Sequence, residues 1–275
     1  MGFPQVRNEI SEQHSSSGGD DADPLDDARL ARRLADSAGR VLLQLRRDGP
    51  HLEPDALKAT GDLMSQEHLA AELGRHRPGD SVLSEEAADD AARLAADRVW
   101  IIDPLDGTRE FSEIPREDWA VHVALWEAGE LVAGAVARPA MGDTLATDAP
   151  PAVPLRAEGP IRLAVSRTRP PAFVTALAER LDAELVPMGS AGVKATAVLD
   201  GTVDAYVHAG GQFEWDSAAP VAVARSAGLH TSRIDGSPLR YNQSDPRLPD
   251  LLICRPEHAD HLLSVIEELT EGEVQ

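Results

Sequence analysis

Strand-like and helix-like segments alternate without interruption from residue 161 to the C-terminal region. Apolar, β-prone stretches occur at 161–165, 184–188, 203–208 and 250–254. Helical patterns follow each of them in turn, at 171–182, 191–199, 216–227 and 256–269. Such alternation is typical of α/β architecture, in which helices cover a sheet. We therefore expect the C-terminal half of the chain to be an α/β unit.

The N-terminal half has a different pattern, in which helices come first and strands follow. A long amphipathic helix is expected from Asp23 and Pro24 to about Arg47, because leucines and small apolar residues recur at helical spacing. A second helix is expected from about Ser65 to Arg75. Strands are then predicted at 81–83, 98–102, 119–125 and 131–137. This half therefore has an α+β pattern.

Two stretches of unusual composition divide the chain. Residues 1–22 are rich in Ser, Gly, Gln and Asp and are expected to form a disordered acidic leader. Residues 139–160 contain five prolines and two glycines, which predicts a boundary or a long surface loop. We therefore divide the chain into the leader at 1–22, an N-terminal half at 23–155 and a C-terminal half at 156–275.

The charge of the chain excludes some classes of partner. Its 275 residues include 26 Lys and Arg against 47 Asp and Glu, a net charge of −21. Such a field repels nucleic-acid polymers and anionic membranes, so neither is expected as a partner. No apolar stretch is long enough for a membrane span or a secretory signal, and we expect a cytoplasmic protein. The single cysteine, Cys254, excludes an internal disulfide and zinc sites with two or more thiolates.

The most informative motif is Asp103-Pro104-Leu105-Asp106-Gly107-Thr108, which directly follows a predicted strand. Pro104 forces a turn, so both carboxylates and a carbonyl oxygen between them can face one space. Oxygen ligands of this kind suit Mg²⁺. Gly107 and Thr108 add the N–H and hydroxyl groups needed to hold a phosphate beside a metal. Alone, the motif is equally compatible with a solvated acidic turn.

Further carboxylates lie at the ends of other predicted elements. Glu85 and Glu86 follow the strand at 81–83, and Asp216 is expected to cap the helix at 216–227. Each taken singly is an ordinary surface or capping residue. Four carboxylates from three separated segments, each at the end of an element, are better explained by a shared cavity that holds more than one metal ion.

Four motifs occur in an order that resembles a known family. They are S-E-E at 84–86, W-I-I-D-P-L-D-G-T at 100–108, G-S-A at 189–191 and W-D-S-A-A-P at 215–220. The chain resembles the lithium-sensitive, magnesium-dependent phosphatase superfamily of inositol monophosphatases, fructose-1,6-bisphosphatases and 3′-phosphoadenosine 5′-phosphate phosphatases. Arg109-Glu110-Phe111 and Lys194 are similar to the CysQ branch of that superfamily. The resemblance implies a five-layer αβαβα sandwich with the active site where the two halves meet.

The resemblance also implies the ligands of two Mg²⁺ ions. One would be held by Glu85, Asp103 and the carbonyl oxygen of Leu105, and the other by Asp103, Asp106 and Asp216. Two such metals can clamp the attacking and leaving oxygens of a phosphoryl transfer, with water as the nucleophile.

In the family, a threonine paired with an upstream aspartate handles the proton of this water. Thr108 matches the threonine, and position along the chain assigns Asp62 as its partner and as a ligand of a third, weaker Mg²⁺. The alternative is that Asp62 only caps the helix expected from Ser65. Glu86 is included as a further catalytic candidate.

Ser190 and Lys194 are the candidates for substrate binding from the second half. Lys194 follows the Gly-Ser turn near the start of a predicted helix, where a cation and a helix terminus can receive a phosphate. The alternative is a solvated lysine. Substrate contacts are also expected from the residues around the metals, namely Glu85, Leu105, Asp106, Gly107, Thr108 and Asp216.

The function implied by the resemblance is Mg²⁺-dependent hydrolysis of 3′-phosphoadenosine 5′-phosphate to AMP and phosphate, a reaction of sulfur metabolism. The same chemistry on inositol monophosphate or fructose 1,6-bisphosphate is the alternative. A non-enzymatic metal-binding scaffold is a third reading, against which the intact set of carboxylates and Thr108 argues. The expected partner is a small phosphorylated substrate, and relatives of this kind commonly form homodimers.

Overall fold

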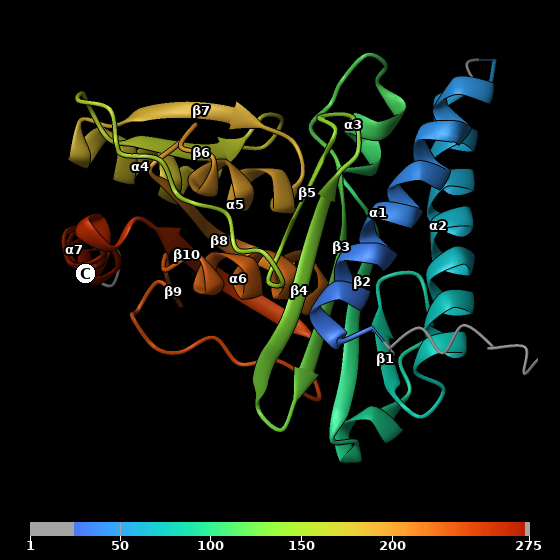
Figure 1. Cartoon of the computed structure of the whole chain (residues 1–275). Coiled ribbons are helices and arrows are strands. Elements are labelled where there is room, and N and C mark those ends of the chain that lie inside the picture. Colours follow the sequence, from blue (N-terminus) through green and yellow to red (C-terminus); the bar gives the residue numbers. More distant parts are fainter. Residues whose placement is uncertain (1–24, 50, 273–275) are drawn as a thin grey trace, which may run out of the picture.

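The computed structural model describes residues 25–49 and 51–272, which form two five-stranded sheets with helices between and outside them (Figure 1). The expected leader at 1–22 lies outside the described residues, as do Asp23 and Pro24. None of the helices in the described ranges is long and apolar enough to cross a membrane.

Two long helices open the described chain, and both differ from the prediction at their first residue. Helix α1 is Asp27–Asp48, and its N-cap is Asp26, whose carboxylate accepts the N–H of Arg29 at 2.8 Å. Helix α2 is Pro54–His76 and begins eleven residues before the expected Ser65. Proline at the first helical position suits this start, because its missing N–H has no intrahelical partner there.

The first sheet has the strand order β1-β2-β3-β4-β5. Strand β1 pairs in parallel with β2, and the remaining pairs are antiparallel. The strands are β1 Ser81–Ser84, β2 Arg98–Asp106, β3 Ala120–Glu127, β4 Glu130–Arg138 and β5 Asp143–Ala146. A 3₁₀ turn, η1 (Ala91–Ala95), precedes β2, and a short helix, α3 (Thr108–Ser112), follows it. Strand β5 lies inside the stretch expected to be a loop or boundary.

The second sheet has the order β7-β6-β8-β10-β9 and is mixed, because β10 runs antiparallel to both β8 and β9. Its strands are β6 Arg162–Ser166, β7 Glu184–Met188, β8 Ala205–Phe213, β9 His230–Ser232 and β10 Arg247–Cys254. The helices of this half are α4 Ala172–Leu181, α5 Ala191–Leu199, α6 Glu214–Ser226 and α7 Ala259–Gly272, the last preceded by η2 Pro256–His258. The alternation read from the sequence is confirmed, although β9 was missed.

The elements stack in five layers, as the αβαβα prediction requires. Helices α1 and α2 cover one face of the first sheet, α5 and α6 lie between the sheets, and α4 and α7 cover the outer face of the second (Figure 1). Strand β2 shows why both faces are apolar. Val99 and Ile101 pack into the central core, whereas Trp100 and Ile102 pack toward α1 and α2. All strands of the first sheet precede residue 155, and all strands of the second sheet follow it. Helices α5 and α6 pack against both sheets.

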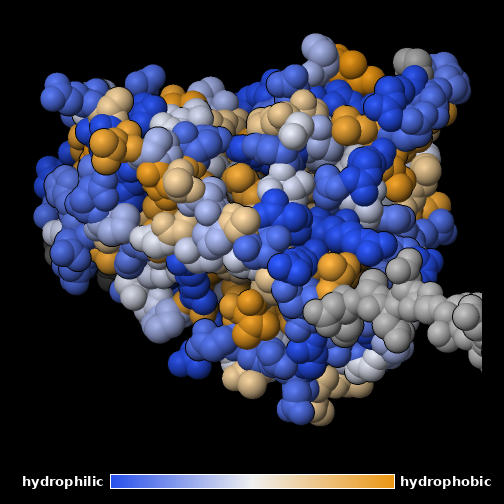
Figure 2. Space-filling model, viewed as in Figure 1, coloured by the Kyte–Doolittle hydropathy of each residue, from blue (hydrophilic) through white to orange (hydrophobic). Residues whose placement is uncertain are grey.

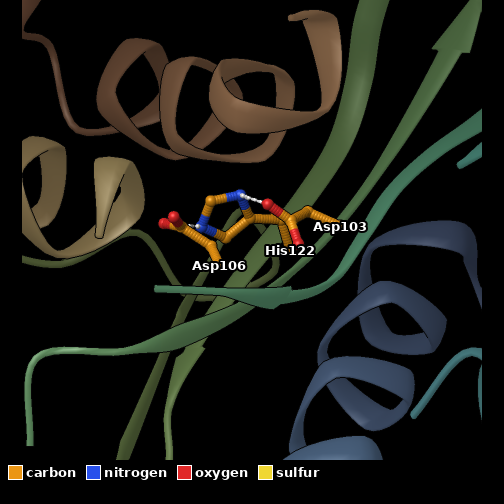
Figure 3. Close-up of side chains that lie close together, drawn as sticks. All are labelled: Asp103, Asp106 and His122. Carbon is orange, nitrogen blue, oxygen red and sulfur yellow. Dashed lines mark ion pairs between the residues drawn. The ribbon is translucent and has the colours of Figure 1, made fainter. Parts of the chain in front are cut away.

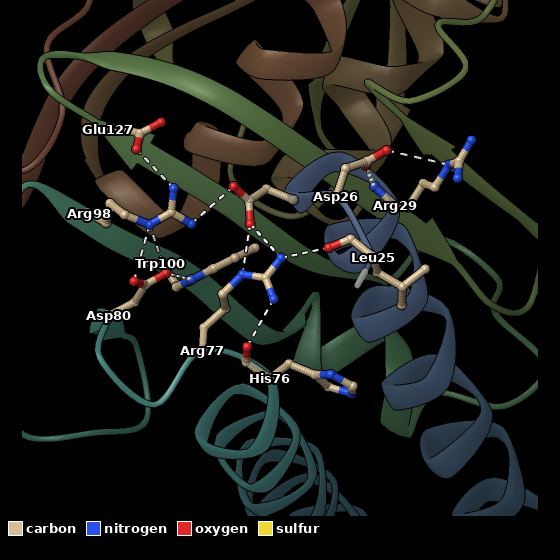
Figure 4. Close-up of polar contacts among 10 residues, drawn as sticks. Leu25, Asp26, Arg29, His76, Arg77, Asp80, Arg98, Trp100 and Glu127 are labelled. Carbon is tan, nitrogen blue, oxygen red and sulfur yellow. Dashed lines mark hydrogen bonds and ion pairs between the residues drawn. The ribbon is translucent and has the colours of Figure 1, made fainter. Parts of the chain in front are cut away.

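An ion-pair network ties the first helices to the first sheet at the end opposite the carboxylate motif (Figure 4). Arg98 on β2 contacts Asp27, Asp80 and Glu127, and Arg77 after α2 also bonds to Asp27. The face of the molecule in Figure 2 is mostly hydrophilic, with apolar side chains scattered over it.

Candidate active site

The carboxylates singled out in the sequence converge because strand ends meet at one edge of the first sheet. Asp103 and Asp106 lie in the last part of β2. Since β1 runs parallel to β2, its end lies beside them, and the N–H of Glu85 bonds to the carbonyl oxygen of Ile102 at 3.4 Å. Asp216 approaches from the first turn of α6, in the layer between the sheets. The charges of Glu85 and Asp216 both act on Asp103, so three segments approach one another here.

Asp103 is at the centre of this group and is buried. Its Oδ1 accepts the N–H of Leu105 at 3.0 Å, where the pairing of β2 with β3 is irregular between Asp103 and Asp106. Burial, followed by the charges of Glu85, Asp106 and Asp216, raises the pKa of Asp103 well above its ordinary value. A buried carboxylate among three others is unfavourable without a compensating cation.

Asp106 is held by the first turn of α5. Its carboxylate accepts the hydroxyl of Ser190 at 2.5 Å and the N–H groups of Ala191 and Gly192 at 3.0 and 2.6 Å. Ser190 is the N-cap of α5 and adopts a φ of 54°, a backbone conformation that costs energy for any residue other than glycine. Donors from the second half thus orient a candidate metal ligand from the first.

His122 on β3 is the residue that sequence reasoning missed. The antiparallel register places it directly opposite Asp103, and its side chain is fully buried between Asp103 and Asp106 (Figure 3). Nε2 lies 3.2 Å from Asp106, and Nδ1 lies 3.9 Å from Asp103. One potential ligand atom from each of these three residues lies within 4.8 Å of the others. The available signal was a single histidine inside the apolar stretch at 119–125.

His122 and Lys194 set the charge state of Asp106. Burial alone would raise the pKa of Asp106, but His122, Lys194 and Ser190 together hold it below its ordinary value. Burial lowers the pKa of His122, and the adjacent Asp106 overcomes that effect, so the net shift is upward. Asp106 is therefore the carboxylate of this group that stays ionised most readily.

The remaining carboxylates repel one another. Loss of surrounding water and the charge of Asp216 raise the pKa of Glu85 to about 7. Burial and then Asp106 raise the pKa of Asp216 to about 6. Burial and then Glu86 raise the pKa of Asp62 to about 6. This crowding of hard oxygen donors fits divalent cations such as Mg²⁺, whose charge would let all of these groups ionise together.

The structure rules out the alternative reading of Asp62 and corrects the expectation about Asp216. Asp62 does not cap a helix near Ser65, because α2 already starts at Pro54 and Asp62 lies inside it. Asp216 is not the N-cap of α6. It occupies the third helical position, from which its carboxylate reaches back to the N–H of Phe213 at 2.7 Å.

The hydroxyl of Thr108 has a different partner from the one expected. It donates to the carbonyl oxygen of Leu105 at 3.1 Å, instead of bonding to Asp62. Asp62 lies near Glu86, which is exposed at the turn after β1. The pairing of Thr108 with Asp62 therefore remains a prediction.

Two adjoining cavities lie beside the carboxylate group. One has a volume of about 220 Å³, and among the residues that line it are Gly107, Thr108, Arg109, Arg169, Ser190 and Lys194. The other has a volume of about 320 Å³ and shares Ser166, Arg169 and Lys194 with the first. Larger cavities lie against α7 and beside the start of α1, and none of the predicted site residues lines them.

Lys194 is not a solvated lysine, since only 8% of it is exposed. Its Nζ donates to the carbonyl oxygen of Ser190 at 2.7 Å and lies 5.5 Å from the centre of the Tyr206 ring. Burial lowers its pKa, and Asp106 and Glu110 oppose that shift. A buried amine between two cavities is placed to meet an anionic ligand.

The chain belongs to the inositol monophosphatase family, whose model matches residues 28–152 and 154–271. It is 55% identical over 243 residues to the 3′-phosphoadenosine 5′-phosphate phosphatase of Mycobacterium bovis, covering 84% of this chain and 90% of the relative. Its identity to the enzyme of the same name from Mycobacterium leprae is 51% over 257 residues, covering 89% and 95%.

Among solved structures, CysQ from Bacteroides thetaiotaomicron is described as a bacterial member of the inositol monophosphatase family. It superposes with a TM-score of 0.70 at 25% sequence identity, covering 83% of this chain and 96% of that one. The resemblance inferred from the four motifs, and the fold that it implied, are thus confirmed.

Proposed function

We propose that the chain is a Mg²⁺-dependent phosphomonoesterase that hydrolyses 3′-phosphoadenosine 5′-phosphate to AMP and phosphate. The observation that carries the proposal is the 55% sequence identity to an enzyme named for this activity, over 84% of this chain. The carboxylate group beside two cation-lined cavities supports it chemically.

The proposed metal ligands are Glu85, Asp103, the carbonyl of Leu105, Asp106 and Asp216. When bound, Mg²⁺ supplies the positive charge that a phosphoryl transition state requires and makes water more acidic. We propose two ions, with a third, weaker one near Asp62. Further support comes from the raised pKa values of Glu85, Asp103 and Asp216, since the bare carboxylates are short of positive charge.

Proton handling is assigned to Thr108 and Asp62, with Glu86 nearby. A pKa of about 6 for Asp62 lies close to the working pH expected of a general base. The hydroxyl of Thr108 would have to leave the carbonyl of Leu105 to reach this carboxylate. Binding of substrate is the event proposed to bring about that change.

Substrate choice is assigned to the second cavity. A 3′,5′-bisphosphate places one phosphate at the carboxylate group and carries a second that must be neutralised within a chain of net charge −21. Lys194 and Arg169 line both cavities and can supply that charge. The hydroxyl of Ser190 bonds to Asp106, and its carbonyl oxygen accepts a bond from the amine of Lys194. These two contacts support a place for Ser190 in the substrate site.

The test is phosphate release from three esters by the purified full chain, with Mg²⁺ and with a chelator. The substrates are 3′-phosphoadenosine 5′-phosphate, inositol 1-phosphate and fructose 1,6-bisphosphate. A preference for the nucleotide, lost in the chelator, supports the proposal. A preference for either other ester contradicts the substrate, and no release from any of them favours a non-enzymatic scaffold. A cytoplasmic location and a homodimer remain further predictions.

A further inference from the structure

A fully buried arginine outside the carboxylate group joins two segments that are far apart in the sequence. Only 1% of Arg93, in η1, is exposed. Its guanidinium bonds to Asp89 through Nε at 2.6 Å and through Nη2 at 3.0 Å. It also bonds to Oδ1 of Asn242 at 2.7 Å and to the carbonyl oxygen of Gln243 at 2.9 Å. Arg93 thereby fastens the segment after β1 to the loop before β10.

The same loop is fastened to the first residue of α6. Glu214 is buried, and its two carboxylate oxygens accept the N–H groups of Asn242 and Gln243 at 2.6 and 2.8 Å. The side-chain amide of Asn242 returns a bond to the carbonyl oxygen of Arg93 at 3.3 Å. Asn242 has a φ of 59°, a conformation that asparagine tolerates better than most residues. These bonds form one buried network from η1 to α6, with Asn242 at its centre.

Both ends of this network adjoin candidate metal ligands. Glu85 comes four residues before Asp89, and Asp216 comes two residues after Glu214. The bonds of Arg93 and Glu214 to Asn242 and Gln243 therefore join the segment that follows Glu85 to the helical turn that carries Asp216. Bonds to charged groups in a buried setting are the kind that resist relative movement of the segments that they join.

We propose that Arg93, Asn242 and Glu214 form a positioning network that holds the Glu85 turn at a fixed place relative to Asp216, so that Mg²⁺ meets ligands already in place. None of the three is among the proposed metal ligands or the proposed substrate-binding residues. The inference rests on the ligand assignment proposed above. It predicts that breaking the network weakens Mg²⁺ binding by more than the accompanying loss of stability explains.

The structure offers a matched control in Arg138. This arginine on β4 is also buried, with 5% exposed, and also bonds to two acidic residues, Asp143 at 2.9 and 2.5 Å and Asp200 at 2.7 Å. Neither partner adjoins a candidate ligand. Arg93→Met and Arg138→Met therefore each remove one buried guanidinium, but only the first removes it from the proposed network.

The experiment measures Mg²⁺ affinity by isothermal titration calorimetry on metal-free full-length protein, at a temperature where circular dichroism shows each variant folded. Arg93→Met should raise the Kd for Mg²⁺ by about 10- to 100-fold, the range for residues that orient metal ligands. Arg138→Met should change it less than about twofold. Excess Mg²⁺ should restore most of the kcat of Arg93→Met, because the ligands themselves are intact.

A milder variant covers the case in which Arg93→Met does not fold. Asp89→Asn removes the ion pair but leaves the bonds of Arg93 to Asn242 and Gln243, so a smaller rise in Kd is expected. Unchanged affinity in the folded variants, or equal weakening in Arg138→Met, overturns the positioning role. Failure of the wild-type chain to bind Mg²⁺ would instead contradict the proposed function.

Discussion

The imidazole of His122 bonds through Nδ1 to the carbonyl oxygen of Trp215 at 3.0 Å. A carbonyl oxygen can only accept, so Nδ1 carries a hydrogen and the ring is fixed in orientation. Trp215 directly precedes Asp216, and the other ring nitrogen faces Asp106 at 3.2 Å. His122 thus connects the strand that carries Asp103 and Asp106 to the helix that carries Asp216.

Gly192 leaves the space that His122 occupies. A Cβ at this position would lie 2.0 Å from Nε2 of His122, so Gly192→Ala should lower the free energy of unfolding by about 1–3 kcal/mol. In a His122→Ala background the same substitution should no longer destabilise, because the clashing ring is absent. Urea unfolding of the wild type, the two single variants and the double variant gives the coupling energy between positions 122 and 192 directly.

Gly74 provides the control for this cycle. It lies in α2, and a Cβ added there would have no atom within 4 Å, so Gly74→Ala should stabilise by about 0.5–1 kcal/mol through helix propensity alone. If Gly192→Ala lowers the free energy of unfolding by the same amount when the His122 ring is absent, the clash lies with another group.

Asp103→Asn should abolish turnover while the fold is kept. The residue is the proposed bridge between two metals, so its neutralisation weakens both sites at once. Stability of the metal-free protein should hold or rise, because one of several crowded carboxylates is removed. Phosphate release and circular dichroism are the measurements. A folded variant with more than a tenth of wild-type activity, a loss below ~1.4 kcal/mol, would contradict the bridging role.

The pKa of Glu85 predicts how stability depends on pH without metal. The folded protein holds this proton up to about pH 7, whereas the unfolded chain loses it near 4.5. Between these values the folded state binds more protons, so the contribution of Glu85 to stability falls as pH rises. Glu85→Gln should therefore stabilise the chelator-treated protein more at pH 7.5 than at pH 5. An equal effect at both pH values would refute the assigned shift.

The choice of ion provides another test. Activity should require Mg²⁺ and fall when Ca²⁺ is added in excess, because Ca²⁺ is larger and accepts irregular coordination. Inhibition by Li⁺ is expected from the family resemblance. Rates measured with each ion against a chelator control check both points. Full activity in the chelator would contradict the metal mechanism, whereas indifference to Li⁺ would only set this chain apart from its lithium-sensitive relatives.

Much of the proposed site could be predicted from the sequence because each proposed ligand lies at or near the end of a recognisable element. The apolar run before Asp103 indicated where the carboxylates would lie, but the expected turn at Pro104 was wrong, because β2 continues through Pro104 to Asp106. The parallel pairing of β1 with β2 brings Glu85 beside them. His122 could not be found this way, since only the register of β3 against β2 places it opposite Asp103. Periodicity within one strand contains no information about register between strands.

Errors at element boundaries had a similar origin. The helical period before Ser65 is weak, because Gly61 and Asp62 interrupt it. Gly61 is nevertheless required, since a Cβ there would lie 2.8 Å from the Phe111 ring. Strand β8 continues beyond the expected His208 through Gly210 and Gly211, both at positive φ, beside the register shift in β10. Tertiary packing and pairing with a distant strand set these ends, and neither is visible in a local pattern.

Lys194 supplies the last prediction, which concerns substrate choice. Lys194→Met keeps the apolar stem in its buried place and removes the charge that the second phosphate is proposed to meet. The KM for 3′-phosphoadenosine 5′-phosphate should rise by about 10- to 100-fold, the equivalent of a contact worth ~1.5–3 kcal/mol. The kcat should change less, because the contact is similar in the ground and transition states. Hydrolysis of inositol 1-phosphate, which lacks a second phosphate, should be affected less than hydrolysis of the nucleotide.

The control is Lys58→Met. Lys58 is the chain's other lysine, and its amine pairs with Asp55 on α2 at 3.0 Å. Equal losses on both substrates would assign Lys194 a structural role through Ser190 and Asp106 instead of a part in specificity.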